Sequence, residues 1–468
     1  MAQLNSMAQT VVIGLGRSGL GAARLLQASG HSVSVIDSGQ GELLEAKAES
    51  LREQGIEVRL QSPFAIDSFR PWLDDVQRVV ISPGIPWDHP TIEQLRQHGI
   101  AVDGEMAVAW DALQHIPWVG ITGTNGKTTV THLLSHVLGK AGLAAPMGGN
   151  MGVSAAEMAL SLQQQSAAPP DWLLMELSSY QIEAAERIRP RIGIWTTLTP
   201  DHLERHGTVE AYRAIKRGLL KRSDQAIFNA DDPDLRQQRR SWNGGIWVSA
   251  ESAQPDGLPA DLWIDAEGWV HEPTQRLFRA DALAMPGAHN RQNLLLVTAA
   301  ARRIGLSPAA IEAGLRSFPG VPHRLEPLGC IGGSQVFNDS KATNYDAAAV
   351  GLRAMRGPVV VLAGGTTKQG DASDWLAELN RRACAVVLFG AGAEELQGLI
   401  TTSGFPGPLS LCNDLSAAVD QAVQRAEALG ASNLLLSPAC ASFDQYRDFE
   451  ARGDHFKQLI HQVQSGSN

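Results

Sequence analysis

Short apolar runs recur along the chain, and most of them lead into a glycine-rich or polar turn. The segment 118–121 has the continuous apolar character of a buried strand. Beyond it, apolar residues recur at helical spacing over 130–138, and Gly142 offers a stop signal. This order predicts a strand, a turn at 122–126 and a helix that begins at Lys127.

The glycine-rich turn is a candidate phosphate-binding site. A strand, a turn and a helix N-terminus direct unpaired backbone N–H groups at one point, and the helix dipole favours an anion there. Lys127 can reach a terminal phosphate, and the Thr128 hydroxyl can hold Mg²⁺. Ile121 stands where the strict phosphate-loop pattern has glycine, so an ordinary glycine-rich turn is the alternative. The residues expected to contact a nucleotide are Gly120, Ile121, Thr122, Gly123, Thr124, Asn125, Gly126, Lys127, Thr128 and Thr129.

A second glycine-rich turn lies near the N-terminus. Gly-Leu-Gly-Arg-Ser-Gly at 14–19 joins an apolar strand to a helix, and Asp37 ends the next strand. This spacing is the dinucleotide fingerprint, which taken alone indicates NAD. The same geometry suits any diphosphate, and a tight turn without a ligand is a further alternative. The strand at 79–81 leads to Ser82 and Gly84, which are candidates for the same site because ligands bind at the carboxyl ends of parallel strands.

Two further strands lead to groups that can bind a metal. Glu176 lies near the end of the apolar run 172–177, and a carboxylate beside a phosphate loop commonly faces the Mg²⁺ of a bound nucleotide. A role in a helix cap at 178–179 is the weaker alternative. His202 lies in a polar loop just past the apolar run 192–196, a position that favours a functional role over a structural one.

The whole pattern predicts an α/β protein of three domains. We expect a Rossmann-like N-terminal domain over 1–112, a central P-loop ATPase-type α/β domain over 113–320 and a Rossmann-like C-terminal domain over 321–468. Within the central domain, short apolar runs alternate with turns over 245–283 and predict a small β meander. Three α/β units in series place the ligand site in the clefts between them.

Composition and charge narrow the class of protein. The 468 residues are 44% hydrophobic, which suffices for cored globular domains. The net charge of −10, from 39 basic and 49 acidic residues, argues weakly against a nucleic-acid surface. We expect neither a signal peptide, because the N-terminus is not basic, nor a membrane span of ~20 apolar residues. The four cysteines are far apart in sequence, which fits reduced thiols in a cytoplasmic protein.

Taken together, these motifs resemble those of the Mur ligases, the ATP-dependent amino-acid-adding enzymes of peptidoglycan synthesis. Thr-Gly-Thr-Asn-Gly-Lys-Thr at 122–128 is similar to the family's ATP loop, which departs from the strict rule in the same way. The segments 437–446 and 449–453 are similar to those of the D-glutamate-adding members. The Asp-Asn-Pro-Arg sequence of the diaminopimelate-adding relatives does not occur. The resemblance covers essentially the whole chain and includes the segments 148–150, 176–181, 201–202, 212–216, 289–293, 323–324 and 338–344.

The resemblance implies an ATP-dependent ligase. ATP would phosphorylate the carboxylate of UDP-N-acetylmuramoyl-L-alanine, and the amine of D-glutamate would attack the acyl phosphate. A tetrahedral intermediate would then collapse to the amide, ADP and phosphate. By similarity, Thr128 and Glu176 would hold one Mg²⁺, and His202 with a carbamylated Lys216 would hold a second metal. Without the resemblance, a solvated helix lysine would be the preferred interpretation of Lys216.

Further roles follow from the resemblance, position by position. Catalytic roles fall on Lys127, His202, Lys216 and Lys341. The other nucleotide contacts implied are Asn290, Asn293, His323, Arg324 and Asp339. The substrate contacts implied are Arg17, Ser18, Asp37, Ser38, Ser82 and Gly84 for UDP, Asn150 and Gln181 for the muramoyl-alanine arm, and Thr343, Lys368, Ser442 and Phe449 for glutamate.

Three other functions compete with this interpretation. One is a related ligase of the Mur and folylpolyglutamate superfamily with a different acceptor. Another is an NAD-dependent dehydrogenase, which leaves the phosphate loop unexplained, and the third is a nucleotide switch, which lacks a recognisable guanine-reading motif. For the ligase we expect a cytoplasmic monomer whose partners are small molecules, with neither nucleic acid nor membrane among them.

Overall fold

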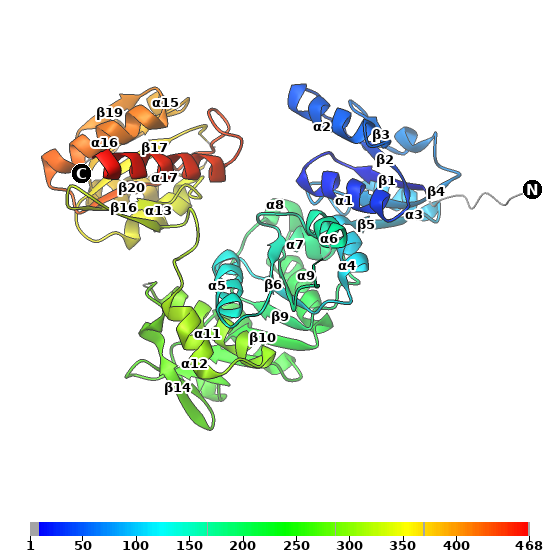
Figure 1. Ribbon diagram of the computed structural model, residues 1–468, viewed down its shortest axis with the longest axis horizontal. Coiled ribbons are helices and arrows are strands. Elements are labelled where there is room, and N and C mark those ends of the chain that lie inside the picture. Colours follow the sequence, from blue (N-terminus) through cyan, green and yellow to red (C-terminus); the bar gives the residue numbers. More distant parts are fainter. Residues whose placement is uncertain (1–8, 166, 286, 368–369, 467–468) are drawn as a thin grey trace, which may run out of the picture. The chain divides into compact units, whose positions relative to one another are not determined.

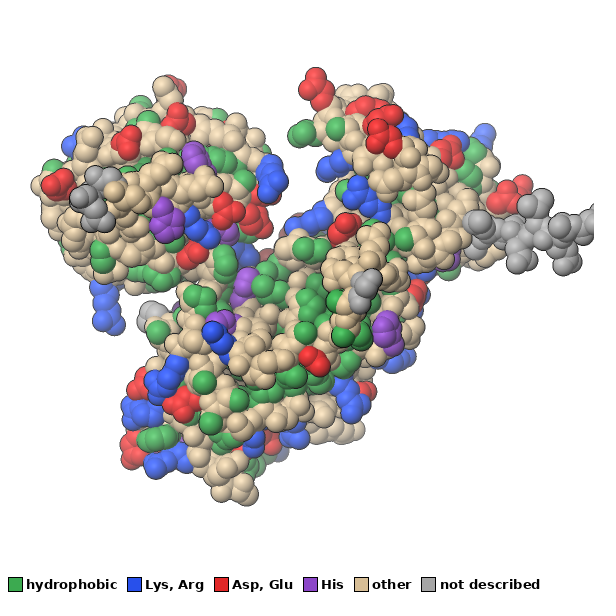
Figure 2. Space-filling view, viewed as in Figure 1, with side chains coloured by type: hydrophobic (Ala, Val, Ile, Leu, Met, Phe, Trp, Pro, Cys, Tyr) green, Lys and Arg blue, Asp and Glu red, His purple; other side chains and the backbone are tan. Residues whose placement is uncertain are grey.

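The computed structural model describes residues 9–165, 167–285, 287–367 and 370–466. Contacts divide the chain into two compact units, 1–318 and 319–468. The first unit carries two β-sheets and the second carries one, so each of the three predicted α/β regions has its own sheet (Figure 1). Figure 2 shows acidic and basic side chains interspersed on the visible face of each part. In the described residues no helix is both long and apolar enough to cross a bilayer.

The first sheet is parallel, with the strand order β3-β2-β1-β4-β5. Its apolar strands are covered by helices, and the glycine-rich turn joins β1 to α1 at the central strand. The elements are β1 (Gln9–Ile13), α1 (Arg17–Ala28), β2 (Ser32–Ile36), α2 (Glu42–Arg52), β3 (Glu57–Arg59), η1 (Ile66–Phe69), β4 (Val76–Ile81), α3 (Pro90–Gln97), β5 (Ala101–Gly104) and α4 (Glu105–Leu113).

The central sheet has nine strands in the order β14-β13-β12-β11-β10-β9-β6-β8-β7. The phosphate-loop strand β6 lies between β8 and β9, the two strands that lead to Glu176 and to the His202 loop. The first elements are β6 (Trp118–Thr122), α5 (Lys127–Lys140), β7 (Met147–Gly149), α6 (Ala155–Gln164), β8 (Leu173–Glu176), α7 (Ser179–Glu183), β9 (Ile192–Trp195), α8 (Leu203–His206) and α9 (Val209–Arg222).

The short strands expected over 245–283 continue this same sheet. β11 and β12 pair in parallel, and an antiparallel hairpin of β13 and β14 extends the edge. The remaining elements are β10 (Gln225–Asn229), α10 (Pro233–Gln237), η2 (Arg239–Ser241), β11 (Ile246–Ser249), η3 (Pro255–Gly257), β12 (Leu262–Ile264), β13 (Trp269–Glu272), β14 (Gln275–Arg279), η4 (Ala280–Ala282), α11 (Ala288–Ile304) and α12 (Pro308–Arg316).

The third sheet has six strands in the order β15-β16-β20-β17-β18-β19, of which only the β15–β16 pair is antiparallel. Strands β15 and β19 were not predicted, because their side chains are mostly half-buried or exposed rather than continuously apolar. The elements are β15 (Glu326–Ile331), β16 (Ser334–Asn338), α13 (Tyr345–Ala354), β17 (Val359–Gly364), α14 (Ser373–Arg382), β18 (Ala383–Phe389), α15 (Ala393–Thr402), β19 (Leu409–Cys412), α16 (Leu415–Leu429), β20 (Asn433–Leu436) and α17 (Phe449–Gly466).

Candidate active site

The phosphate loop connects β6 to α5 as predicted. Gly123 and Gly126 have φ angles of +147° and +85°, a region that only glycine adopts without strain. A Cβ on Gly123 would lie 2.0 Å from the Thr196 hydroxyl oxygen, so the loop also requires glycine for space. The loop therefore directs backbone N–H groups at the start of α5 from a tightly packed conformation.

Two threonines after β9 brace this loop, and the sequence analysis had not identified them. The backbone N–H of Thr124 donates to the Thr197 carbonyl oxygen at 2.9 Å, and that of Asn125 donates to the Thr197 hydroxyl at 2.9 Å. The Thr196 hydroxyl donates to the Asn125 carbonyl oxygen at 2.5 Å. The only signal in the sequence is their position immediately past a strand that neighbours β6.

Two lysines converge on the carbonyl groups of the loop. Lys127 Nζ donates to the carbonyl oxygens of Gly123 and Thr124, both at 2.9 Å. Lys216 Nζ, from α9, donates to the Thr122 hydroxyl at 3.2 Å and to the Gly123 carbonyl oxygen at 3.1 Å. The interpretation of Lys216 as a solvated helix lysine is wrong, because the residue is 1% exposed.

Burial changes the protonation of Lys216. Desolvation lowers the pKa of its amine well below the usual value, and the nearby Lys127 ammonium lowers it further. Asp201 and Glu176 act in the opposite direction with smaller effects. A lowered pKa raises the fraction of the amine that is unprotonated, and only the unprotonated amine is a nucleophile.

Glu176 lies beside the loop with one carboxylate oxygen unpaired. It ends β8, pairs in register with Ile121 of β6, and is 2% exposed. Its Oε1 accepts a 3.0 Å hydrogen bond from the Asn150 side chain. Its Oε2 has no hydrogen-bond partner within the part of the chain that the structure describes. A buried, unpaired carboxylate oxygen next to a phosphate loop fits an oxygen-preferring cation such as Mg²⁺.

No group of three His, Cys, Asp or Glu side chains that could hold a metal occurs among the described residues. Thr128, at the start of α5, and Glu176 could therefore supply only part of a coordination shell. This suits Mg²⁺, which is commonly held by one or two protein groups together with water and the phosphates of a nucleotide.

His202 lies in a group of aromatic side chains near Lys216. Its φ of +53° is left-handed, and its ring centroid is 5.1 Å from that of Tyr180 and 6.5 Å from that of Tyr212. The ring of Tyr212 in turn lies 4.6 Å from Lys216 Nζ, and the Tyr212 hydroxyl is 3.3 Å from the Thr124 hydroxyl. Burial raises the pKa of Tyr212 to about 12. Tyr212 thus contacts the loop, His202 and Lys216. The spacing of residues in the sequence did not predict this role.

Asn290 and Asn293 lie one helical turn apart on α11, which begins at Ala288. The Asn293 amide donates to Asn290 Oδ1 at 3.3 Å, and both side chains are buried. A Cβ on Gly126 would lie 2.8 Å from Asn293 Oδ1, so this asparagine lies against the phosphate loop.

Both residues predicted to bind the muramoyl-alanine arm, Asn150 and Gln181, have structural contacts. Gln181 Oε1 accepts from the Ser178 backbone N–H at 3.0 Å in a capping box at the start of α7. The cap therefore belongs to Ser178 and Gln181, and Glu176 has no part in it. Gly148 and Gly149 form the end of the short strand β7, and the loop proper begins at Asn150.

The N-terminal glycine-rich turn is held by the residues that the sequence associated with it. Asp37 Oδ2 accepts from the Leu15 backbone N–H at 2.5 Å, and its Oδ1 accepts from that of Gly39 at 2.7 Å. Gly14 has a φ of +92°. The Ser82 hydroxyl donates to the Gly14 carbonyl oxygen at 3.3 Å. Both carboxylate oxygens of Asp37 thus accept hydrogen bonds from backbone N–H groups, whereas the acidic residue of the dinucleotide fingerprint contacts a ribose.

The remaining N-terminal candidates lie nearer the surface. Arg17 is exposed, and its Nη1 donates to the Gly152 carbonyl oxygen at 2.7 Å. Ser18 is half-buried, whereas Ser38 and Gly84 are exposed.

The second unit, 319–468, brings the other candidates onto the carboxyl end of β16 and the loops beside it. Asp339 is buried, and its carboxylate accepts from the Leu325 backbone N–H at 3.2 Å and from the Ser437 hydroxyl at 3.1 Å. Burial raises the pKa of Asp339 to about 7. His323 is also buried, and its Nδ1 is 3.1 Å from the Asn338 side-chain nitrogen. Arg324 and Thr343 are half-buried.

Lys341 and Phe449 lie together in this unit. Lys341 Nζ is 5.6 Å from the centre of the Phe449 ring, and the Ser340 hydroxyl donates to the Phe449 carbonyl oxygen at 2.8 Å. Arg452 is fully buried and donates to the carbonyl oxygens of Ser340 and Cys440 at 2.9 and 3.1 Å. It ties the Lys341 loop to the loop that carries the buried Ser442. Lys368 lies outside the described residues.

Family models match three successive parts of the chain. The Mur ligase MurD-like N-terminal domain matches residues 8–104, and the Mur ligase middle domain matches 121–301. The Mur ligase glutamate ligase domain matches 323–440. The three matched parts coincide with the three sheets.

Several bacterial proteins are similar over almost the whole length. A UDP-N-acetylmuramoylalanine–D-glutamate ligase of Parasynechococcus marenigrum (strain WH8102) is 82% identical, with 99% of this chain and 100% of the relative covered. Proteins with the same name from Synechococcus sp. (strain CC9605) and Synechococcus elongatus are 66% and 45% identical. Each of those two alignments covers 97% of this chain, and they cover 98% and 99% of the relatives.

Solved structures share the fold. The crystal structure of the UDP-N-acetylmuramate-alanine ligase MurC from Thermotoga maritima has a TM-score of 0.59 at 18% identity and covers 98% of this chain and 100% of that one. A pseudomurein peptide ligase type C from Methanothermus fervidus has a TM-score of 0.53 at 17% identity, over 97% and 100% of the two chains. With three family models matched in order and relatives similar from end to end, the chain belongs to the Mur ligase family of ATP-dependent amide-forming ligases.

Proposed function

We propose that this chain joins D-glutamate to UDP-N-acetylmuramoyl-L-alanine in an ATP-dependent reaction of peptidoglycan synthesis. The full-length similarity to ligases that carry these two substrates in their name supports the choice of substrates. The proposed chemistry rests on the arrangement around the phosphate loop. Lys127 and Lys216 both bond to the loop, and Glu176 ends the strand that pairs with the loop's own strand.

In the first step, the substrate carboxylate attacks the γ-phosphorus of ATP, and ADP leaves. Two anions must approach each other, so the site must offset negative charge. The loop N–H groups at the start of α5 bind the phosphates. Lys127 is bonded to loop carbonyl groups without the nucleotide, and its ammonium group turns toward the phosphates when ATP binds. Thr128 and Glu176 would hold Mg²⁺, which supplies further positive charge when it is bound.

Lys216 has a distinct role in this proposal. Its neutral amine attacks CO₂ and loses a proton, which gives a carbamate and turns the lysine into an oxygen ligand. With His202 it would then hold a second cation near the transferred phosphate. The lowered pKa of the buried amine supports this step, because only the unprotonated amine can react.

In the second step, the amine of D-glutamate attacks the acyl phosphate carbonyl carbon, and phosphate leaves from the tetrahedral intermediate. We assign Thr343, Lys368, Ser442 and Phe449 to the amino acid and Lys341 to the γ-phosphate. Arg324 suits bidentate phosphate contact. We place the reaction in the cytoplasm, where ATP is available, and expect a monomer with small-molecule partners.

The test is ADP release from the purified chain with ATP and Mg²⁺. UDP-N-acetylmuramoyl-L-alanine is added first, and then D-glutamate, L-glutamate or, in separate assays, another amino acid. Turnover only with the UDP-sugar and D-glutamate together is the expected result. Turnover with L-glutamate would overturn the isomer, and turnover with another amino acid would indicate the related ligase with a different acceptor.

A further inference from the structure

A buried carboxyl group, that of Glu105, lies outside every group assigned above. Glu105 begins α4 directly after β5, and it is 1% exposed. Its Oε1 accepts a 2.7 Å hydrogen bond from the backbone N–H of Ala156, in the first turn of α6. Its Oε2 has no hydrogen-bond partner among the residues that the structure describes. Such a half-paired buried acid costs folding free energy, which calls for a functional explanation.

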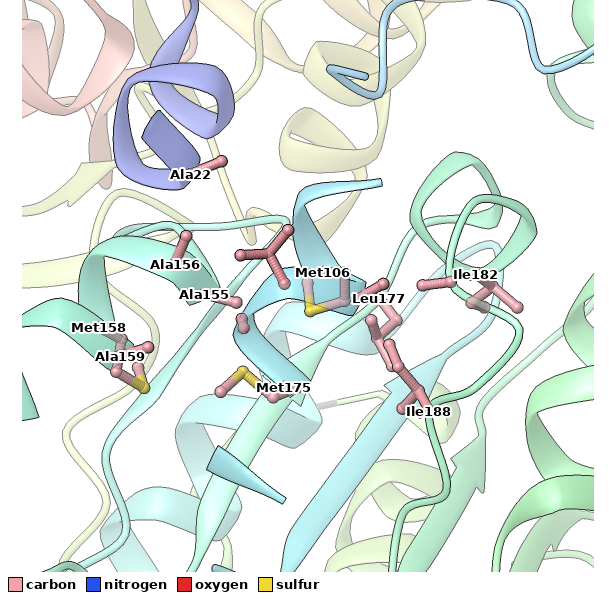
Figure 3. Close-up of a cluster of buried hydrophobic side chains, with 14 of the residues drawn as sticks. Ala22, Met106, Ala155, Ala156, Met158, Ala159, Met175, Leu177, Ile182 and Ile188 are labelled. Atoms are coloured by element: carbon pink, nitrogen blue, oxygen red, sulfur yellow. The ribbon is translucent and has the colours of Figure 1, made fainter. Parts of the chain in front are cut away.

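Apolar side chains pack around the junction in which this carboxyl lies. Figure 3 shows Met106 of α4, Ala155 and Ala156 of α6 and Ala22 of α1 in one cluster of buried side chains. Burial raises the pKa of Glu105 to about 7, against the hydrogen bond from Ala156, the positive charge of Arg17 and the nearby Ser154 hydroxyl and Ala155 N–H. The carboxyl group therefore lies in a closely packed junction between α1, α4 and α6.

Glu105 is bonded to α6, and the loop between β7 and α6 leads directly into that helix. At one end of this loop, the Asn150 backbone N–H donates to the Glu176 carbonyl oxygen at 2.8 Å, next to the Glu176–Asn150 side-chain contact. Near its other end, Arg17 of the glycine-rich turn donates to the Gly152 carbonyl oxygen. The loop thus connects Glu176 to the N-terminal glycine-rich turn, and Glu105 anchors the helix that follows it.

Two features offset part of the cost of burying the charged form of Glu105. A carboxylate at a helix N-terminus is stabilised by the helix dipole, and Arg17 adds a full positive charge from α1. The other carboxylates of the junction have other partners: Glu157 of α6 lies 3.9 Å from Arg24, and Asp103 of β5 bonds to Arg78 and Arg187.

We propose that Glu105 is a positioning residue for a sugar nucleotide whose sugar ends in a carboxylate. Through Ala156 and α6 it fixes the loop at 150–152, so that Arg17 and Asn150 meet the two ends of that substrate in one arrangement. Glu105 itself does not touch the substrate. The inference rests on the proposed function, because that proposal makes Arg17 and Asn150 substrate contacts.

The test separates substrate binding from the rest of the reaction in the full chain. Glu105→Gln keeps the size and the acceptor but removes the charge and places an amide nitrogen at the unpaired position. We expect the Kd for UDP-N-acetylmuramoyl-L-alanine, measured by calorimetry without ATP, to rise about tenfold or more, with KM for ATP and D-glutamate changed less than about twofold. Asp261→Asn is the matched control, since Asp261 also accepts a backbone N–H, that of Trp247, far from this loop, and should leave all three values unchanged.

Two results would overturn the inference: wild-type affinity of Glu105→Gln for the UDP-sugar, or equal worsening of all three substrate constants, which would mean a general structural role. If Glu105→Gln does not fold, Glu105→Asp provides the test, because it keeps the charge but shortens the reach to Ala156. An unchanged UDP-sugar Kd in Glu105→Asp would then refute the proposal. Failure of the proposed function would show differently, as a wild-type chain that does not bind the UDP-sugar.

Discussion

Lys216 Nζ lies 3.1 Å from the carbonyl oxygen of Gly123, although the two residues are 93 positions apart in the chain. The contact places the buried amine of α9 against the phosphate loop, next to the ring of Tyr212. The Lys216 amine therefore packs against the loop that is assigned to the nucleotide, and substitutions at Lys216 and within the loop test the two roles individually.

Lys216→Arg should lower turnover by at least about 100-fold, because an arginine side chain stays protonated and does not form a carbamate. ADP release in the presence of both substrates measures this loss. In parallel, ¹³C NMR of the wild-type chain in ¹³C-bicarbonate should show a carbamate resonance that the variant lacks. Near-normal turnover of the variant would refute the carbamate.

Lys127→Ala should abolish catalysis, with a loss of at least about 100-fold in turnover, because it removes the charge directed at the transferred phosphate. UDP-sugar binding, measured by calorimetry, should remain within about twofold of wild type. Substantial ADP release by this variant would contradict the assignment of the loop to ATP.

Gly123→Ala should disrupt the nucleotide site, because the new methyl group would meet the Thr196 hydroxyl at 2.0 Å and because the φ of +147° is unfavourable for alanine. We expect the Kd for ATP to rise by about tenfold or more. Gly139→Ala, in the same strand–loop–helix unit, is the control: its Cβ meets no other atom, and it should stabilise α5 by about 0.5–1 kcal/mol without changing ATP binding. Equal ATP affinity of both variants would show that the loop tolerates a side chain.

Glu176→Gln should weaken the binding of Mg²⁺, because it replaces the unpaired, buried carboxylate oxygen with a neutral group. The Mg²⁺ concentration for half-maximal ADP release should rise by about tenfold. Asp171→Asn serves as the comparison, because its carboxylate accepts the Ala144 backbone N–H just before the start of β8, at the opposite end of the strand from Glu176. An unchanged Mg²⁺ requirement in Glu176→Gln would exclude this carboxylate as a ligand.

Asp339 makes the stability of the protein depend on pH. Burial raises the pKa of its carboxyl from 3.8 to about 7, so the folded protein binds the proton more tightly than the unfolded chain. The resulting stability is fully present below the unfolded pKa and is lost as the pH rises through about 7. The loss amounts to up to about 4 kcal/mol at one unit of pKa per 1.36 kcal/mol.

Asp339→Asn should remove this dependence. Relative to wild type, the thermal midpoint of the variant should increase between pH 5.5 and pH 8.5. The comparison needs both proteins at both pH values, since other groups titrate in each. A constant difference between the two proteins would mean that Asp339 is ionised throughout.

Local patterns were sufficient to predict the strands, the two glycine-rich turns and the helices that follow them. The apolar run before Gly120 and the helical spacing after Lys127 specify the phosphate loop, because backbone geometry depends mainly on neighbouring residues. The same local logic placed Glu176 near the end of its strand. It did not identify β15 and β19, whose patterns are interrupted by exposed positions.

The sequence by itself determined the order of the α/β elements, the positions of the glycines and the family resemblance, since these depend on short segments of chain. The tertiary structure decided which distant groups meet: Lys216 with Gly123, Thr197 with Asn125, and Glu105 with Ala156. It also decided that Lys216 is buried and that Glu105 is half-paired. Burial and the pKa shifts it causes arise from the packing of elements far apart in the chain, so no local pattern could reveal them.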